Sequence, residues 1–513
     1  MGNMLAKLDS SGIFGLDAFK VEVEVYLTKS LPSFHIVGLP DKAVNESKER
    51  VRAGISSSEF HFPLERITVN LAPADLKKEG PAFDLPIALG ILLATKQLNV
   101  DDIEKYMFIG ELSLNGDIKG VKGILSMAIN CRNEEKEYLI VPKENSFEAA
   151  MISGIKVIPV ENLNQVVDYL QNKIDIKQVK IDKKKLLKNK PDTDIDFKDV
   201  RGQLQSKRAL EIAVAGGHNV ILTGPPGAGK SMLAKRVPTI LPEMSFDEIM
   251  EVTRIYSISG LLSSNSYLVR NRPFRNPHQT ITDVGLIGGG IYPKPGEISL
   301  ANNGVLFLDE ITEFSRNTLE ALRQPMEDGE ILISRNKASF KFPSKFMLIA
   351  SANPCPCGYL GDSINKCKCS NYEISEYRKR LSGPLLDRID LHVFVPRLLK
   401  DDLTGDINCE SSVDIRKRIK KARKIQRKRL SGSKISCNAH MNTKHVSKYC
   451  KLKKDAKKLL ELALERLGIS GRGYFRILKV ARTIADLDQS EEIETNHISE
   501  AIQYRIIDKR YKW

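Results

Sequence analysis

Residues 224 to 231 read GPPGAGKS, and residues 305 to 310 read VLFLDE. A short apolar run, NVIL, precedes the first stretch at 219 to 222, and residues 231 to 237 follow it with a helical pattern. A glycine-rich turn between a strand and a helix lets backbone amides and the helix N-terminus surround phosphate groups. The sequence therefore predicts an α/β fold with a parallel sheet and a phosphate-binding loop.

The side chains of these two stretches have complementary chemistry. Lys230 is expected to reach the outer phosphates of ATP, and Ser231 to ligate Mg²⁺. Asp309 is expected to hold the Mg²⁺ directly or through water, and Glu310 to polarise the attacking water, because phosphoryl transfer needs both. The nucleotide-binding set comprises Gly224, Pro225, Pro226, Gly227, Ala228, Gly229, Lys230, Ser231 and Asp309.

The composition predicts several globular domains. The chain has 513 residues, of which 42% are hydrophobic and 28% charged, whereas one domain usually takes roughly 100 to 200 residues. The longest apolar run, Leu85 to Ala94, is shorter than a membrane-spanning helix, and the N-terminus has no secretory pattern. We therefore expect a cytoplasmic protein with no membrane partner. The net charge of +15 is compatible with a polyanionic partner; a basic chain that binds no polyanion is the alternative.

Two segments carry much of the positive charge. Residues 173 to 190 contain eight lysines and precede Pro191, which is typical of a solvated linker. Residues 413 to 430 contain ten Lys or Arg, and a helical stripe of Ile415, Ile419 and Ala422. The basic face of this second segment is either simply solvated or a nucleic-acid contact.

Four cysteines cluster as two CxC pairs. Nine residues separate the pair Cys355 and Cys357 from the pair Cys367 and Cys369, which lets a loop bring four thiolates around one Zn²⁺. Such a site would be structural, because four cysteines leave no open coordination position. The CxC spacing is tighter than the usual CxxC, so reduced thiols without metal are the alternative.

Several long motifs occur in order along the chain. Together they resemble the ComM/YifB family of magnesium-chelatase-like AAA+ ATPases, and more weakly the MCM helicases. The resemblance implies an AAA+ core with a C-terminal helical lid, assembled as a homo-hexameric ring with ATP sites shared between subunits. The motifs are RPFRNPHQTI (272 to 281), GLIGGG (285 to 290), PGEISLANNGVLFLDE (295 to 310), LRQPMEDG (322 to 329), NPCPCGYLGD (353 to 362) and LSGPLLDRIDLHV (381 to 393).

The resemblance assigns three further catalytic residues. Asn353, after a third strand at 346 to 350, matches the polar sensor that AAA+ proteins place between the two earlier strands; a structural asparagine turn is the alternative. Arg388 matches the arginine finger offered to the neighbour's ATP. Arg472 matches the second sensor arginine, on a lid helix whose apolar side carries Ile477, Val480, Ala481 and Ile484.

Two insertions distinguish this core from a minimal one. About eighty residues separate the phosphate loop from Asp309, where the family has a loop insertion. The runs ILIS (331 to 334) and ASFKF (338 to 342) predict a hairpin. The resemblance puts Arg335, Lys337 and Lys341 of this hairpin near a ring pore, where MCM-like motors touch DNA. A solvated hairpin is the alternative.

The N-terminal region differs in pattern. Strand-like runs occur at 21 to 27, 66 to 72 and 138 to 142, and GELSLNGDIKGVKG (110 to 123) with VPKEN (141 to 145) resembles an α+β Lon-protease domain. Ala82 and Leu125 stand where Lon proteases have serine and lysine, so we expect no proteolysis but an assembly or docking collar. The expected domains are 1–170, a lysine-rich linker at 171–195, the AAA+ core at 196–397 and the helical lid at 398–513.

Two functions remain in competition. The resemblance to ComM implies a motor on branched or single-stranded DNA, a helicase or branch-migration factor in recombination or natural transformation. The alternative is a magnesium-chelatase-type ATPase that remodels a partner protein. An ATP-dependent protease is disfavoured by Ala82 and Leu125.

Overall fold

The computed structural model describes residues 5–182, 195–262, 267–290, 293–335, 338–398, 409–433 and 435–510, without the side chains of 335, 338 and 506–510. The chain divides into two compact units. The N-terminal unit contains residues 1–189 and 246–270, and the C-terminal unit contains 190–245 and 271–513. The segment 246–270, which the sequence analysis placed inside the AAA+ core, therefore belongs to the N-terminal unit.

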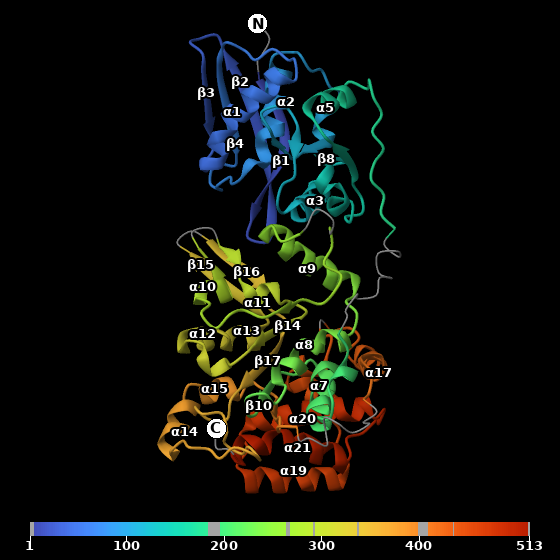
Figure 1. The fold of residues 1–513 in the computed structure, drawn as a ribbon. Coiled ribbons are helices and arrows are strands. Elements are labelled where there is room, and N and C mark those ends of the chain that lie inside the picture. Colours follow the sequence, from blue (N-terminus) through green and yellow to red (C-terminus); the bar gives the residue numbers. More distant parts are fainter. Residues whose placement is uncertain are drawn as a thin grey trace. The chain divides into compact units, whose positions relative to one another are not determined.

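A seven-stranded mixed sheet forms the N-terminal unit, in the order β3-β4-β2-β1-β5-β8-β9 (Figure 1). β1 pairs antiparallel with β2, and β2 with β4, whereas the other neighbours are parallel. The three predicted strand runs are confirmed as β2, β4 and β8. The strands are β1 (Leu5–Phe14), β2 (Asp17–Thr28), β3 (Ser33–Val37), β4 (Arg66–Ala72), β5 (Tyr106–Phe108), β8 (Tyr138–Pro142) and β9 (Lys156–Val160).

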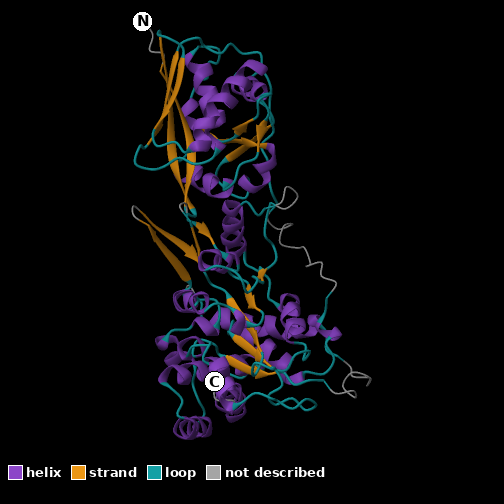
Figure 2. Ribbon diagram, turned by 60° about the vertical axis from the view of Figure 1, so that its left-hand side comes forward, coloured by secondary structure: helices purple, strands orange, loops and turns teal. Residues whose placement is uncertain are grey.

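Helices pack along one side of the long strands of this sheet (Figure 2). Alternate residues of β2, namely Val21, Val23, Val25 and Leu27, are buried because side chains of a strand point to opposite faces. The longest apolar run of the sequence forms α2, which lies in this core. Among the described helices, none is both long and apolar enough to cross a bilayer. The helices are α1 (Lys42–Ser57), α2 (Asp84–Ala94), α3 (Ile124–Asn133), α4 (Ser146–Ala149) and α5 (Leu163–Leu170).

Helix α9 (Phe246–Ser259) joins the N-terminal unit by packing on α3. The Arg254 guanidinium donates to the Leu16 carbonyl at 2.7 Å and to the Ser126 hydroxyl at 2.9 Å. The Ser257 hydroxyl donates to the buried carboxyl group of Glu148. These polar contacts join residues that are far apart in the sequence. They hold α9 against the core of the N-terminal unit, although in the chain α9 follows the helix after the phosphate loop.

A five-stranded parallel sheet lies at the centre of the C-terminal unit, in the order β11-β14-β17-β10-β18. The third predicted strand, β17, lies between the two that carry the phosphate loop and the acidic pair, as expected. Parallel strands bring their carboxyl ends to one edge, where the functional residues gather. The strands are β10 (Val220–Thr223), β11 (Phe274–Arg275), β14 (Val305–Leu308), β17 (Met347–Ala352) and β18 (Leu391–Phe394).

Helices complete the C-terminal unit, and in its described residues five of them, α17 to α21, lie in the predicted helical region. The expected apolar stripe of α20 is confirmed, since Ile477, Val480, Ala481 and Ile484 are all buried. The helices are α7 (Leu204–Gly216), α8 (Lys230–Ile240), α12 (Arg316–Ala321), α13 (Arg323–Asp328), α14 (Asn371–Arg378), α15 (Gly383–Leu386), α17 (Ser412–Arg429), α18 (Thr443–Tyr449), α19 (Lys454–Leu467), α20 (Gly471–Leu487) and α21 (Thr495–Arg510).

Helix α17 is the predicted basic helix, and Ile415, Ile419 and Ala422 are its buried stripe. Several of its basic side chains form ion pairs within the C-terminal unit. Arg418 pairs with Glu211, and Arg429 pairs with Asp486. Three exposed lysines remain at helical spacing, and we call them the α17 lysine stripe: Lys421, Lys424 and Lys428.

The two insertions of the C-terminal unit form small hairpins. GLIGGG folds as α10 (Asp283–Ile287) and β12 (Gly288–Gly289), which pairs with β13 (Lys294–Pro295). Gly288 has a φ of +103°, and a Cβ there would lie 2.3 Å from the Lys294 carbonyl oxygen.

The second hairpin, β15 (Glu330–Arg335) with β16 (Ala338–Pro343), is confirmed by its antiparallel pairing. The exposed Lys341 lies 3.0 Å from Glu330. Lys337 and the side chain of Arg335 lie outside the described residues.

Candidate nucleotide site and cysteine cluster

The predicted phosphate loop connects β10 to α8. Gly227 and Gly229 have φ values of +77° and +89°, which favour glycine, and a Cβ at either would meet no atom within 4 Å. A Cβ at Gly224 would lie 2.1 Å from the Val395 carbonyl oxygen of the segment after β18. The first amides of α8 have no acceptor within the helix, so they can bind an anion at this turn.

Lys230 lies folded over the loop with 9% of its surface exposed. Its ammonium donates to the carbonyls of Gly224 at 2.5 Å and Pro225 at 3.0 Å, and to Asn353 Oδ1 at 3.1 Å. Burial lowers the pKa of Lys230 to about 8, against the opposing influence of Asp309 and Glu310. A buried ammonium with mainly neutral partners is suited to bind a phosphate group, which would supply the missing counter-charge.

Ser231 and Asp309 bring two oxygen ligands together. The Ser231 hydroxyl lies 3.0 and 2.9 Å from the two carboxylate oxygens of Asp309. The Ser351 hydroxyl donates to Asp309 Oδ1 at 2.5 Å and accepts the Glu310 N–H at 2.9 Å. Hydroxyl and carboxylate oxygens are the ligands that Mg²⁺ prefers, so this pair fits the ion that accompanies ATP.

Ser351 is a site residue that sequence reasoning missed. It is fully buried in β17, pairs in register with Leu222 of β10, and lies two positions before Asn353. A polar residue at the carboxyl end of a central, otherwise apolar strand was the available signal.

Glu310 and Asn353 are the remaining predicted site residues at the carboxyl edge of the parallel sheet. Glu310 is exposed and has a φ of +53°, an uncommon conformation for a residue other than glycine that occurs at functional turns. Asn353 follows β17 and contacts Lys230 directly. A Cβ at Gly358 would lie 2.7 Å from Pro226, so the loop after Asn353 packs closely against the phosphate loop.

Arg388 and Arg472 lie together at one carboxylate. Arg388 is 6% exposed; one of its nitrogens is 2.7 Å from Glu327 Oε2, and another donates to the Pro384 carbonyl at 2.7 Å. Arg472 is far more exposed and lies 3.7 Å from Glu327 Oε1. No hydrogen bond or ion pair joins either arginine to Lys230 or Asp309 in the described part of the chain.

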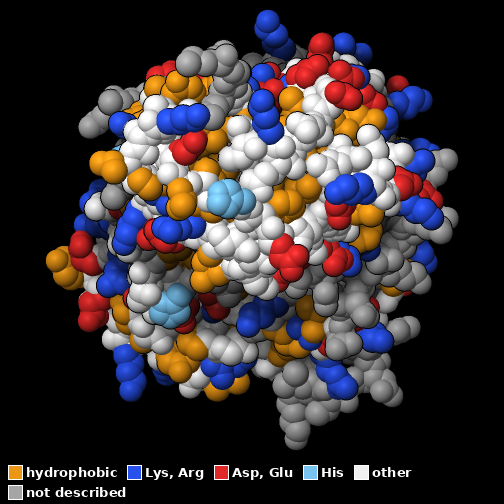
Figure 3. Space-filling model, turned by 90° about the horizontal axis from the view of Figure 1, so that it is seen from above, with side chains coloured by type: hydrophobic (Ala, Val, Ile, Leu, Met, Phe, Trp, Pro, Cys, Tyr) orange, Lys and Arg blue, Asp and Glu red, His pale blue; other side chains and the backbone are white. Residues whose placement is uncertain are grey.

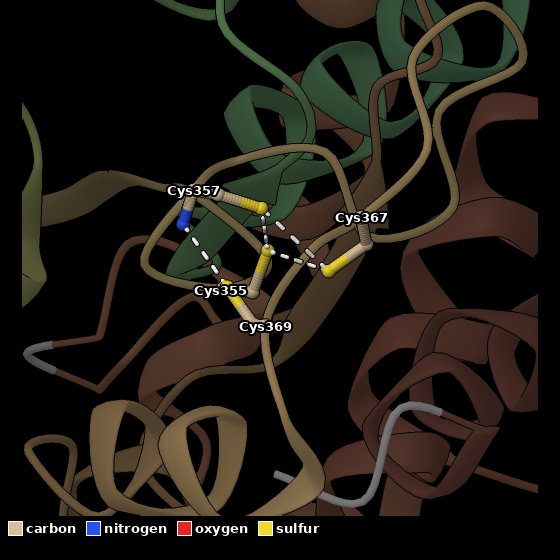
Figure 4. A group of neighbouring side chains, drawn as sticks. All are labelled: Cys355, Cys357, Cys367 and Cys369. Carbon is tan, nitrogen blue, oxygen red and sulfur yellow. Dashed lines mark hydrogen bonds between the residues drawn. The ribbon is translucent and has the colours of Figure 1, made fainter.

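The four clustered cysteines converge (Figure 4). Cys355 Sγ lies 3.4 Å from Cys357 Sγ and 3.6 Å from Cys367 Sγ, and all four sulfurs lie within 4.8 Å of one another. Four thiolates at about 2.3 Å from a tetrahedral Zn²⁺ would lie about 3.8 Å apart. The predicted cluster is thus formed, with nearly the spacing that one metal ion requires, and Cys369 completes it.

Sheet order and site define the class. A phosphate loop follows β10, an Asp-Glu pair follows β14, and an asparagine follows the strand between them. This arrangement is that of a P-loop AAA+ ATPase core with a C-terminal helical region.

Comparisons with known proteins agree with this class. Family models described as "Magnesium chelatase, subunit ChlI", "Subunit ChlI of Mg-chelatase" and "Magnesium chelatase, subunit ChlI C-terminal" match residues 196–403, 23–145 and 409–505. Competence protein ComM of Haemophilus influenzae is 44% identical over 507 residues, covering 98% of this chain and 97% of the relative. YifB of Escherichia coli is 41% identical, with 98% of each chain covered.

A more distant relative is the magnesium-chelatase 38 kDa subunit of Cereibacter sphaeroides, 25% identical over 174 residues, 31% of this chain and 52% of the relative. The chain belongs to the ComM/YifB family of magnesium-chelatase-like AAA+ ATPases.

Proposed function

We propose that the protein is a ring-shaped ATP-driven motor that moves along DNA and migrates branched junctions in recombination or natural transformation. The observation that carries this proposal is the 44% identity, over 98% of the chain, to a protein named for competence, the state in which cells take up DNA. The net charge of +15 agrees with a polyanionic partner. The exposed α17 lysine stripe of Lys421, Lys424 and Lys428 supplies part of that charge.

In the proposed reaction, Lys230 neutralises the outer phosphates, and Ser231 with Asp309 holds Mg²⁺. Glu310 orients and polarises the attacking water, and Asn353 senses the γ-phosphate next to Lys230. Bound Mg²⁺ supplies charge neutralisation in the transition state. Arg388 acts on the ATP of the next subunit, as the family resemblance implies, since an arginine finger stabilises the charge of the transition state. Arg472 acts as the second sensor.

The proposed DNA contacts are the α17 lysine stripe and hairpin β15–β16, including Lys341. On the face shown in Figure 3, Lys and Arg side chains alternate with Asp and Glu and do not gather into one patch. We therefore do not assign DNA binding to that face, and we propose that contact is made through the α17 lysine stripe and the hairpin.

A four-way DNA junction tests the proposal. With ATP and Mg²⁺, the hexamer should bind and dissociate the junction, and binding should weaken steeply with salt because phosphate contacts release counterions. A Lys421→Glu/Lys424→Glu/Lys428→Glu variant should lose most of this binding. A matched Lys454→Glu/Lys457→Glu/Lys458→Glu variant of α19, with the same change in charge, should keep it. If the wild type turns over ATP but ignores the junction, a DNA motor is excluded.

The second candidate is a chelatase-type ATPase that remodels a partner protein. It is favoured by the three family models, which all carry the description of a magnesium-chelatase subunit. On this alternative, ATP turnover would be indifferent to DNA and would respond to a protein partner.

For the cysteine cluster we propose one structural Zn²⁺, held by Cys355, Cys357, Cys367 and Cys369. The sulfur distances support it, and four thiolates leave no position for substrate. By its position the ion would brace the loop after Asn353.

For the N-terminal unit we propose a Lon-like domain without protease activity that serves in assembly or docking. Ala82 and Leu125 are both buried and carry neither a nucleophile nor a base. Peptide cleavage by the pure protein that depends on a serine or lysine side chain would exclude this role.

A further inference from the structure

We propose that Glu327 is a latch that withholds Arg388 from the neighbouring subunit's nucleotide. The inference rests on the proposed function in one respect, that Arg388 completes the next subunit's ATP site. It adds a role for a residue of the LRQPMEDG motif (322 to 329) to which the sequence analysis gave none, and a means by which contact with DNA could control hydrolysis.

The first support for the latch is that Arg388 is buried and already has partners within its own subunit. An arginine finger must present its guanidinium to a phosphate outside its own subunit, yet this one is 6% exposed. It lies 2.7 Å from Glu327 Oε2 and donates to the Pro384 carbonyl. Reaching a phosphate therefore requires an exchange of partners, in which the guanidinium leaves one anion for another.

The second support is that the proposed arginine finger and the proposed second sensor meet at the same carboxylate. Arg472 lies 3.7 Å from the other oxygen of Glu327. Arg388, then Arg472 and Arg476, lower the pKa of Glu327, so the carboxylate stays charged at neutral pH. Arg476 itself is held by Asp390 at 2.7 Å. One ionised side chain thus contacts both of the arginines that the family resemblance assigns to the ATP sites.

The third support is the position of Glu327 in the chain. It lies in the last turn of α13, and only Asp328 and Gly329 separate it from β15 of the proposed DNA hairpin. The other end of the hairpin returns to the same place, because the Ser344 N–H donates to the Gly329 carbonyl at 2.9 Å. Both ends of the hairpin therefore meet at Gly329, two residues from Glu327. A strand of DNA that displaces the hairpin would shift Glu327 and so release Arg388.

The test is ATP turnover of a Glu327→Gln variant without polynucleotide. The neutral amide keeps the shape but loses the charge, so turnover should rise about fivefold or more, a typical coupling between sites. The rise should vanish in Glu327→Gln/Arg388→Ala, because it acts through Arg388. Glu327→Asp, which keeps the charge but withdraws it from the guanidinium, should show a smaller rise. Asp328→Asn, an exposed neighbour, should turn over ATP as the wild type does.

The outcomes separate the latch from the DNA motor. Unchanged or lower turnover in both Glu327→Gln and Glu327→Asp, with ATP binding and melting temperature preserved, overturns the latch, and so does a rise that persists without Arg388. Wild-type turnover that does not respond to single-stranded DNA or to a junction overturns the DNA motor instead. If wild-type turnover does not respond to DNA but Glu327→Gln still raises turnover, something other than DNA releases Arg388.

Discussion

Ser231 and Asp309 stand 78 positions apart in the chain, yet the Ser231 hydroxyl lies 2.9 Å from Asp309 Oδ2 at the carboxyl edge of the parallel sheet. Ser231 lies in the first turn of α8 and Asp309 follows β14, so only the order of strands brings them together. The Ser351 hydroxyl, from the strand between, contacts the same carboxylate. Three elements therefore fix the geometry of one proposed Mg²⁺ site, which gives the first prediction.

Ser351→Ala should weaken Mg²⁺-dependent ATP turnover about 10- to 100-fold, as loss of a partner behind a metal ligand typically does. The hydroxyl orients Asp309 and accepts the Glu310 N–H, so its loss frees both residues. Titration of turnover with Mg²⁺ measures the shift in the half-saturating concentration. Ser375→Ala, an exposed serine of α14, is the control. An unchanged Mg²⁺ dependence would mean that Asp309 is held well enough without Ser351.

Glu310→Gln should bind ATP as the wild type does and lose turnover by about 10²- to 10⁴-fold, because the amide cannot accept a proton from water. Nucleotide binding by calorimetry and phosphate release measure the two effects separately. Glu313→Gln, an exposed carboxylate that pairs with Arg380, should retain activity. Normal phosphate release from Glu310→Gln would place the base on another residue.

Arg388→Ala should abolish turnover, by about 10³-fold or more, and leave ATP binding by the isolated subunit intact. Lys230→Ala should be inactive for a different reason, since its own phosphate loop fails. In a shared site, mixing the two variants pairs an intact loop from one subunit with an intact arginine from the other. The mixture should therefore recover part of the turnover. A mixture that stays inactive at every ratio, although it assembles, would contradict sites shared between subunits.

Local patterns predicted the strands, the phosphate loop and hairpin β15–β16, because each depends on residues close in sequence. The placement of α9 on the N-terminal unit depends on hydrogen bonds of Arg254 and Ser257 to partners more than a hundred positions away. The hydrophobic periodicity of a helix predicts which face is buried, but not the segment against which it packs. The charge pattern of α17 indicated its exposed lysines but not its ion pairs, for the same reason. Ten cations in eighteen residues indicate a solvated face, yet Arg418 and Arg429 are paired with acids from distant segments. Neither of the motifs that contain Arg388 and Glu327 indicated that these two residues pair.

Zinc analysis of the purified protein should give one ion per chain. Cys367→Ser/Cys369→Ser should lose the metal, lower the melting temperature and raise the KM for ATP, since a Cβ at Gly358 of the same loop would be 2.7 Å from Pro226. Atomic absorption and a thermal scan measure these effects. Cys409→Ser, which lies outside the cluster, should change none of them. Protein purified without chelators that contains no metal, with four thiols reactive, would show a cluster of free cysteines.

The buried carboxyl group of Glu148 should make the stability of the N-terminal unit depend on pH. Burial raises its pKa from 4.5 to about 7, although Ser257 and the Leu125 N–H donate to it. Between these two values the folded state keeps a proton that the unfolded state releases, so stability falls as the pH rises from about 4.5 to about 7. Above about pH 7 both states are ionised and the loss, on the order of 3 kcal/mol at most, is complete.

Glu148→Gln should remove this dependence, because an amide has no proton to lose and its oxygen can still accept from the Leu125 N–H. Its melting temperature should therefore exceed that of the wild type at pH 8 and approach it at pH 5. Calorimetric scans across this range provide the measurement, and Glu144→Gln, an exposed carboxylate nearby, should follow the wild-type curve. If Glu148→Gln melts lower than the wild type at pH 8, the ionised carboxylate stabilises the contact with α9, and burial does not dominate there.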